Sequence, residues 1–242
     1  MINNSFTQFA EAFNDFIRAV RDKMPAYEDR KDILFIVDDL EKLPFEIAQT
    51  IFIGNVTQLQ QIDSNFIYSA PIDLLYAGNQ LQQFFKTVTL PMIKIFEKNG
   101  SKNEKGYTVL REMIFKRADK KLFKPQGIVD TIIENSGGNP RQVLQLLSYA
   151  HSHAKKDVFD KKSIDEAIHD FSVVFQRFLT DDDYQLLCSI DTSDTFTPSE
   201  RVRFLLYHVA LLEYNEFWWS SHPVVRLLPS YKECRKTEGA SK

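Results

Sequence analysis

Residues 33–43 read ILFIVDDLEKL, and this stretch decides the fold that the sequence predicts. Five consecutive apolar residues, most of them β-branched or aromatic, are typical of a strand buried on both faces of a parallel sheet. Asp38 and Asp39 follow where such a strand would leave the sheet, the edge at which open α/β sheets bind ligands. Carboxylates suit a hard cation such as Mg²⁺. We therefore expect a cation-binding edge, although the same pair could simply cap a helix beginning near Pro44.

The surrounding segments extend this pattern into a small α/β unit. Residues 5–24 repeat apolar side chains at three- and four-residue spacing, which predicts an amphipathic helix. Residues 65–69 (NFIYS) predict a second strand that ends in Ser69. Strand, helix and strand in this order predict a parallel sheet. A third apolar run, residues 88–96, contains Pro91, which would confine it to an edge or interrupted strand.

The second half of the sequence is helical in pattern and contains the motif GGNPR at residues 137–141. Gly138 suits the left-handed residue that ends a helix, and Asn139 can cap the next helix with Pro140 at its first position. Arg141 then lies in the first turn, where the helix dipole favours anions. The motif predicts either an anion-binding arginine or a well-capped helical hairpin with a surface arginine.

Residues 181–230 predict a winged helix. A helix is expected over residues 181–190, and the capping-box pattern TPSE at residues 197–200 predicts a helix that continues to about Tyr214. The two strands of the wing are then expected around residues 217–219 and 224–227.

DNA binding by this segment is expected to be weak. Acids outnumber bases from residue 181 onward, and the candidate recognition helix offers only Arg201, Arg203 and His208 as cations. Phosphate contacts usually need a denser basic surface.

The composition sets further bounds. The chain has 242 residues and a net charge of −3, so it has no overall attraction for nucleic acid or anionic lipid. Its two cysteines, Cys188 and Cys234, indicate neither a disulfide framework nor a zinc site. No apolar run is long enough to span a membrane, and the first residues lack a signal-peptide pattern. We expect a soluble, cytoplasmic protein without membrane contacts.

Two strands ending in Asp-Asp and Ser, the GGNPR motif and a winged helix follow one another in the order found in AAA+ and STAND P-loop ATPases. The sequence resembles the branch of that family related to replication-origin-binding initiators. The resemblance implies an α/β part followed by an all-α part: a partial P-loop NTPase core in residues 1–100, a helical lid in residues 101–179, a winged helix in residues 180–230 and a polar tail in residues 231–242.

The resemblance also implies ATP and Mg²⁺ as cofactors and assigns roles to individual residues. Asp38 would hold the Mg²⁺ shell as the first Walker B acid, and Asp39 would polarise the attacking water. Ser69 would act as sensor 1 at the γ-phosphate or the water, and Arg141 would be the sensor 2 arginine that reaches the γ-phosphate. The turn expected to pack near the adenine consists of Gly138, Asn139 and Pro140.

One departure from the family decides activity. None of the eight glycines begins a GK[ST] triplet, so the sequence lacks the phosphate loop that holds the β- and γ-phosphates. The strand that precedes this loop in the family is absent as well, because only a helix precedes residue 33. ATP binding and hydrolysis are therefore expected only if a missing N-terminal segment or another chain completes the site.

Two alternatives stay open beside this hypothesis. The chain could be a non-catalytic module for protein interaction, or a DNA-binding regulator that acts through its winged helix. A homo-oligomer is compatible with each hypothesis.

Overall fold

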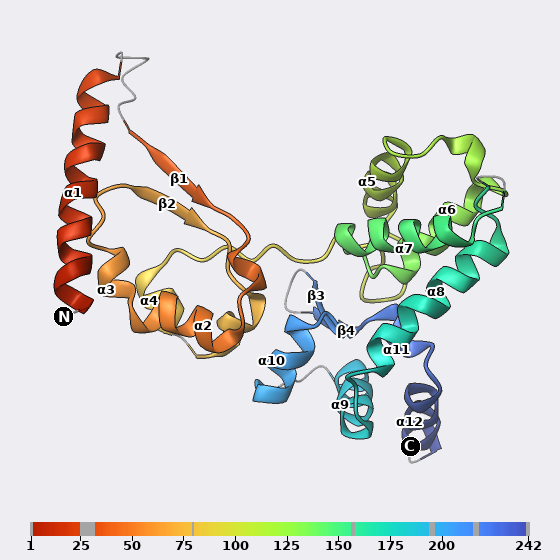
Figure 1. Cartoon of the computed structure of the whole chain (residues 1–242). Coiled ribbons are helices and arrows are strands. Elements are labelled where there is room, and N and C mark those ends of the chain that lie inside the picture. The colour runs from red at the N-terminus through yellow and green to blue at the C-terminus, as the bar shows by residue number, and fades with distance from the viewer. Residues whose placement is uncertain are drawn as a thin grey trace. The chain divides into compact units, whose positions relative to one another are not determined.

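The computed structural model describes residues 2–24, 32–78, 80–155, 158–193, 197–214 and 218–240. The chain forms two compact units, Met1–Thr89 and Leu90–Lys242, whose elements are labelled in Figure 1. The segments predicted as lid and winged helix both belong to the second unit. Among the described helices, none combines the length and the apolar composition that crossing a bilayer requires.

The first unit contains the predicted parallel sheet. Its two strands pair in the register Leu34↔Asn65 to Val37↔Tyr68. This pairing confirms the prediction of a strand–helix–strand unit. The elements of the unit are α1 (Ile2–Lys23), β1 (Leu34–Val37), a 3₁₀ turn (Leu40–Lys42), α2 (Phe45–Gln49), a π turn (Thr50–Gly54), α3 (Val56–Leu59), β2 (Asn65–Tyr68), a 3₁₀ helix (Ile72–Tyr76) and α4 (Gln80–Phe84).

The prediction that β1 is buried on both faces is wrong. Phe35 lies on the covered face, where its ring contacts Phe13 of α1 at 5.8 Å and Phe66 of β2 at 5.0 Å. The opposite face is open: Leu34 is 53% exposed and Ile36 is 70% exposed. Successive side chains of a strand point to opposite faces, so covering one side of a two-stranded sheet leaves every second residue in solvent. An apolar run cannot reveal this difference.

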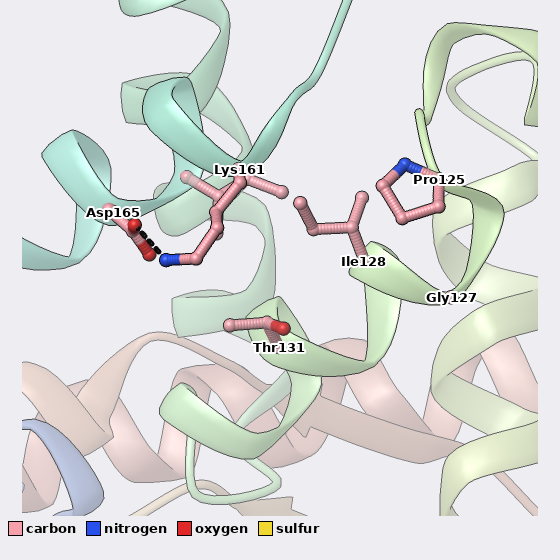
Figure 2. Close-up of a pocket in the computed structure, with 7 residues that line it drawn as sticks. Pro125, Gly127, Ile128, Thr131, Lys161 and Asp165 are labelled. Atoms are coloured by element: carbon pink, nitrogen blue, oxygen red, sulfur yellow. Dashed lines mark hydrogen bonds and ion pairs between the residues drawn. The ribbon is translucent and has the colours of Figure 1, made fainter.

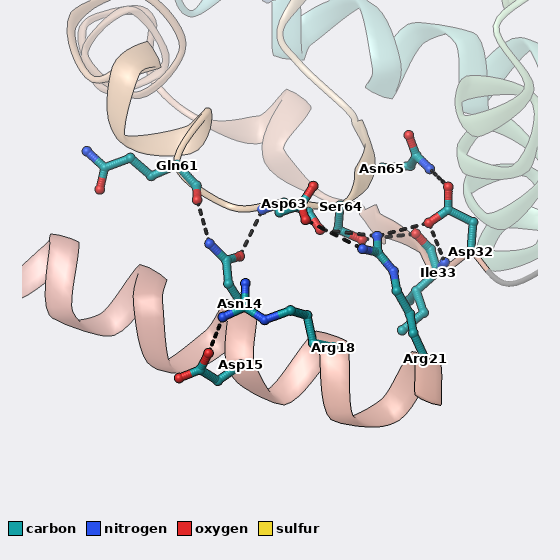
Figure 3. Close-up of polar contacts among 10 residues, drawn as sticks. All are labelled: Asn14, Asp15, Arg18, Arg21, Asp32, Ile33, Gln61, Asp63, Ser64 and Asn65. Atoms are coloured by element: carbon teal, nitrogen blue, oxygen red, sulfur yellow. Dashed lines mark hydrogen bonds and ion pairs between the residues drawn. The ribbon is translucent and has the colours of Figure 1, made fainter. Parts of the chain in front are cut away.

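Polar contacts attach α1 to the residues that precede β1 and β2, as Figure 3 shows. The Asn14 side chain donates to the carbonyl of Gln61 and accepts from the amide of Asp63, both at 2.8 Å. Arg21 donates to Asp32 at 2.9 Å and to the Asp63 carbonyl at 3.1 Å. These bonds fix the helix along the covered side of the sheet.

A small apolar core of the first unit lies near the carboxyl end of β2. Ala48, Phe52, Leu74 and Leu81 are buried together, and the ring of Tyr68 from β2 packs against Phe52 at 5.7 Å. The helices α2 and α4 therefore meet the end of the sheet from which the predicted site residues emerge.

The expected strand over residues 88–96 is not formed. Val88 and Leu90 are 84% and 90% exposed, and Pro91 has no amide to donate to a ladder. From Met92 onward the segment is hydrogen-bonded to other residues of the second unit. The amide of Met92 donates to the Glu213 carbonyl and that of Ile93 to the Gly138 carbonyl, both at 3.0 Å. The run is apolar because it packs on other elements, not because it joins the sheet.

The second unit is mainly helical, as predicted. Its elements are α5 (Glu104–Phe115), two 3₁₀ turns (Lys120–Leu122 and Gln126–Ile128), α6 (Val129–Asn135), α7 (Pro140–His153), α8 (Lys161–Gln176), α9 (Asp181–Thr192), α10 (Glu200–Tyr207), β3 (Leu211–Tyr214), β4 (Trp218–Ser221), α11 (Pro223–Arg226) and α12 (Pro229–Ala240).

The predicted winged-helix segment needs two corrections. Helix α10 is capped by Ser199, whose side chain accepts from the Val202 amide, and it ends at Tyr207. Residues 211–214 form β3, which pairs antiparallel with β4. Residues 224–227 were expected as a strand, but Pro223 and the capping side chain of His222 start the short helix α11 there.

The hairpin of β3 and β4 differs from an exposed wing. All four residues of β3 are buried, and so are Ser220 and Ser221 of β4. The predicted strand start at Phe217 and the turn before it, residues 215–216, lie outside the described residues. Whether these elements function as a winged helix stays a prediction.

The predicted polar tail, residues 231–242, is helical as far as Ala240. Tyr231 anchors this helix: its side chain is buried, its hydroxyl bonds to Asp191, and its carbonyl accepts from Cys188. Tyr231 thus links the start of α12 to α9, a contact that composition alone does not indicate.

Candidate functional site

Two predicted site residues meet at one edge of the β1–β2 sheet. Because the strands are parallel and Val37 pairs with Tyr68, Asp38 and Ser69 leave the sheet side by side. The Ser69 amide donates to the Val37 carbonyl at 3.0 Å. The Ser69 hydroxyl accepts from the Leu40 amide and donates to Glu41 Oε2, each at 2.9 Å. Ser69 thus ties the end of β2 to the turn that follows β1.

This turn is shaped by the two aspartates. Asp39 has a φ of 66°, in the left-handed region that aspartate tolerates better than most residues. Its amide donates to the carboxylate of Asp38 at 2.8 Å. Asp39 precedes the 3₁₀ turn Leu40–Lys42, but its own side chain makes no capping bond there. The alternative that both aspartates serve as helix caps is therefore unsupported for Asp39.

A third carboxylate joins the pair. Carboxylate oxygens of Asp38, Asp39 and Glu41 all lie within 4.8 Å of one another. Asp38 and Asp39 are exposed and Glu41 is half-buried, and Lys42 forms an ion pair with Asp39 at 2.5 Å. Oxygen ligands with room for retained waters are what Mg²⁺ requires. Glu41 is not among the site residues that the sequence predicts, because its approach depends on the tight turn that brings position 41 back toward position 38.

The GGNPR motif forms the predicted helix boundary in the second unit. Gly137 and Gly138 have φ values of 59° and 79°. Asn139 accepts from the amides of Arg141 at 3.0 Å and Gln142 at 3.4 Å, and Pro140 occupies the first position of α7. The capping prediction is confirmed in each of these parts.

Close packing gives a second reason for the glycines. A Cβ on Gly138 would lie 1.9 Å from the Ile93 carbonyl oxygen, and one on Gly137 would lie 2.2 Å from Leu212 Cδ1. Both glycines are buried, whereas Pro140 and Arg141 are exposed. Any ligand at this turn would therefore meet the exposed residues that follow the two glycines.

Distant residues hold the carbonyls of the turn. The Ile93 amide donates to the Gly138 carbonyl at 3.0 Å, and the Tyr214 hydroxyl donates to the Gly137 carbonyl at 2.7 Å. Next to them, buried His222 bonds through Nε2 to Gln142 Oε1 at 2.8 Å, while its Nδ1 accepts from Val224. Burial lowers the pKa of His222 to about 3, so the ring is neutral at physiological pH. No short motif around these residues predicted such long-range contacts.

The structure thus gathers Asp38, Asp39 and Ser69 with Glu41 at one edge of the first unit. Arg141 and the turn of Gly138, Asn139 and Pro140 belong to the second unit, so a joint site with the aspartates stays a prediction. Neither a protein family nor a curated protein nor a solved structure matches this chain. We therefore infer function from the geometry of the residues alone.

Proposed function

We propose that this chain contributes the magnesium-binding edge and the helical lid of an AAA+/STAND-like, ATP-dependent switch. The phosphate loop would come from residues outside this sequence or from another chain. The observation that carries the proposal is the meeting of Asp38, Asp39, Glu41 and Ser69 at the carboxyl ends of two parallel strands. Ligands of α/β sheets bind at such edges.

In this proposal each residue has a distinct task. Asp38 would hold the Mg²⁺ shell, with Glu41 as a further oxygen ligand or an acceptor for a bound water. Asp39 would orient the attacking water, and Ser69 would contact that water or the γ-phosphate. Arg141 would stabilise the charge that develops on the phosphate, a contribution that is electrostatic and needs no covalent step.

The open side of the sheet supports an incomplete core. Leu34, Ile36 and Ile67 are each more than half exposed on the uncovered face. A two-stranded sheet also has two free edges, and sheets of two strands are rarely stable without further strands or helices. A strand bearing a phosphate loop would add to a free edge.

Cation binding at the acidic edge is the direct test. Titration of the ¹⁵N-labelled chain with Mn²⁺ is expected to broaden the amide signals of Asp38, Leu40 and Ser69 first. Asp38→Asn should abolish this selective broadening. The exposed neighbours Asp181 and Asp182 of α9 provide the internal comparison, because they are adjacent acids without the turn geometry. Equal broadening at both places would contradict the proposal.

Titration with nucleotide distinguishes the proposed function from its alternatives. Without a phosphate loop, calorimetry with ATP and Mg²⁺ should show no saturable low-micromolar binding to this chain alone. At millimolar Mn²⁺·ATP, the Arg141 amide should broaden together with that of Asp38. Broadening confined to the acidic edge would exclude the role proposed for Arg141.

A non-catalytic interaction module is the second candidate, and the exposed face of Leu34, Ile36 and Ile67 favours it. In that case a partner would bind equally well with Asp38→Asn and without nucleotide. The regulator hypothesis receives no comparable support. Arg201, the first cation of its candidate recognition helix, is bound to buried Asp183 and lies over the ring of Phe204 at 4.1 Å.

A further inference from the structure

Two basic segments far apart in the sequence lie side by side in the second unit. The rings of Phe123 and Phe159 stack at 4.8 Å. The Lys124 amide donates to the Phe159 carbonyl at 2.9 Å, and the Phe159 amide donates to the Leu122 carbonyl at 2.7 Å. These contacts join the connection after α5 to the connection between α7 and α8. We define the basic patch here as Lys116, Arg117, Lys120, Lys121, Lys124 and Lys155.

The basic patch concentrates positive charge in a chain whose net charge is −3. All six side chains are exposed. Residues 116–124 contain five cations and a single acid, Asp119. The carboxylate of Asp119 accepts from the Lys121 amide at 2.9 Å and so caps the 3₁₀ turn. Within the described part of the chain, Lys121, Lys124 and Lys155 form no ion pair with an acid.

A small anion is a poor fit to the neighbouring groove. This groove is about 340 Å³ in volume, and Ile164 is among the residues that line it. Figure 2 shows Pro125 and Ile128 at the same groove. Its lysine, Lys161, is already paired with Asp165. Lys121, Lys124 and Lys155 instead occupy exposed positions on both segments, which suits a polyanion that spans the two segments.

We propose that the basic patch binds the phosphate backbone of duplex nucleic acid without reading its sequence. Five of the six cations are lysines, which act as point charges and lack the planar fork that arginine uses to read guanine. The one arginine, Arg117, donates along its own helix to the Met113 carbonyl at 3.3 Å.

The aromatic residues of the region argue against a single strand or a membrane as partner. Phe123 and Phe159 are buried, and Phe115 is covered by Lys120, whose Nζ lies 4.9 Å from the ring centre. Two of these rings are thus buried and the third lies against a lysine and Phe123, whereas single-strand binders present exposed rings for base stacking. Leu122 and Val158 are half-buried, so neither is free to insert into lipid as membrane-binding surfaces require.

The experiment measures binding of the full chain to a fluorescent 20-base-pair duplex across a salt series. We expect micromolar affinity at low salt, since sequence-independent binding falls roughly in the range 10⁻⁴–10⁻⁶ M at physiological salt. The triple variant Lys121→Gln, Lys124→Gln and Lys155→Gln should reduce the slope of log K against log[salt] by about 3, or about 0.9 per lost contact. At 50 mM salt it should weaken binding at least about tenfold.

A matched control carries the same change in charge outside the patch. It replaces the exposed residues Lys105, Lys232 and Lys236 by Gln and should keep the slope of the unmodified chain. Circular dichroism melts establish that both variants are folded. Equal loss in the two variants, absence of binding at 20 mM salt, or tighter binding to a single strand or to anionic vesicles would each overturn the proposal.

Discussion

The two units differ in how completely they bury their own sheets. In the first unit Leu34, Ile36 and Ile67 remain more than half exposed on one face of the parallel pair. In the second unit Leu211 and Leu212 of the antiparallel pair are at most 1% exposed, and the hairpin is bonded to the glycine turn before α7. The second unit therefore buries its strands within its own described residues, whereas the first leaves one apolar face of its sheet exposed.

The largest effect is expected at the glycine turn of the second unit. Gly138→Ala would force a Cβ to within 1.9 Å of a carbonyl oxygen at a positive φ, and we expect a loss of about 3 kcal/mol or more. Gly100→Ala has a positive φ but open space, so it should cost about 1 kcal/mol. Gly127→Ala has neither problem and should be nearly neutral. Chemical denaturation of the three variants measures their free energies of unfolding.

Acid should weaken the second unit selectively. The pKa of His222 is lowered by burial to about 3, whereas the unfolded ring titrates near 6.5. The unfolded state therefore binds more protons between these values, and stability is lost as pH falls from about 6.5 toward 3. The loss should reach roughly 2–4 kcal/mol. Melts of the unmodified chain and of His222→Gln test this, because the variant should lose the part of the dependence that His222 supplies. Residues 1–89 contain no histidine and supply the comparison.

The same truncation should have different costs in the two sheets. Leu212→Ala removes a fully buried side chain and should cost about 2–4 kcal/mol. Ile36→Ala removes one that is 70% exposed and should cost less than about 1 kcal/mol. Equal costs would mean that the face bearing Ile36 is covered in solution.

The smallest effect is expected at the acidic edge. Ser69→Ala removes the acceptor of the Leu40 amide and the donor to Glu41. Each net bond contributes about 1 kcal/mol, so the first unit should lose about 1–2 kcal/mol. Ser64→Ala is a suitable control, because its hydroxyl makes one bond, to the Ile33 carbonyl at 3.0 Å. A loss no larger than that of the control would show that Ser69 does not brace the turn.

Local sequence patterns predicted the structural features that depend on residues close together in the sequence. The strand–helix–strand order gave the parallel pairing of β1 and β2, and the Gly-Asn-Pro pattern gave the boundary before α7. The parallel order of the two strands is also what brings Asp38 and Ser69 to one edge. These features need only the order of the elements, chain direction and capping chemistry.

What was missed depends on contacts distant in the sequence. Residues 211–214 continue the apolar pattern of α10, and only their pairing with β4 and their contact with Gly137 make them a strand. Residues 88–96 are as apolar as a strand, but two of their amides bond to Glu213 and Gly138. Tyr231 similarly docks a helix whose composition is polar. No window of neighbouring residues contains this information.

Native-state hydrogen exchange tests the central contrast most directly. An incomplete core should open more easily than a self-contained helical unit, because free strand edges and an uncovered face stabilise the closed state less. We predict that the amides of residues 33–37 and 66–68 exchange at least about tenfold faster than those of residues 143–147 in α7. Equally slow exchange in the two regions would contradict the account, because the two-stranded sheet would then be complete without any further strand.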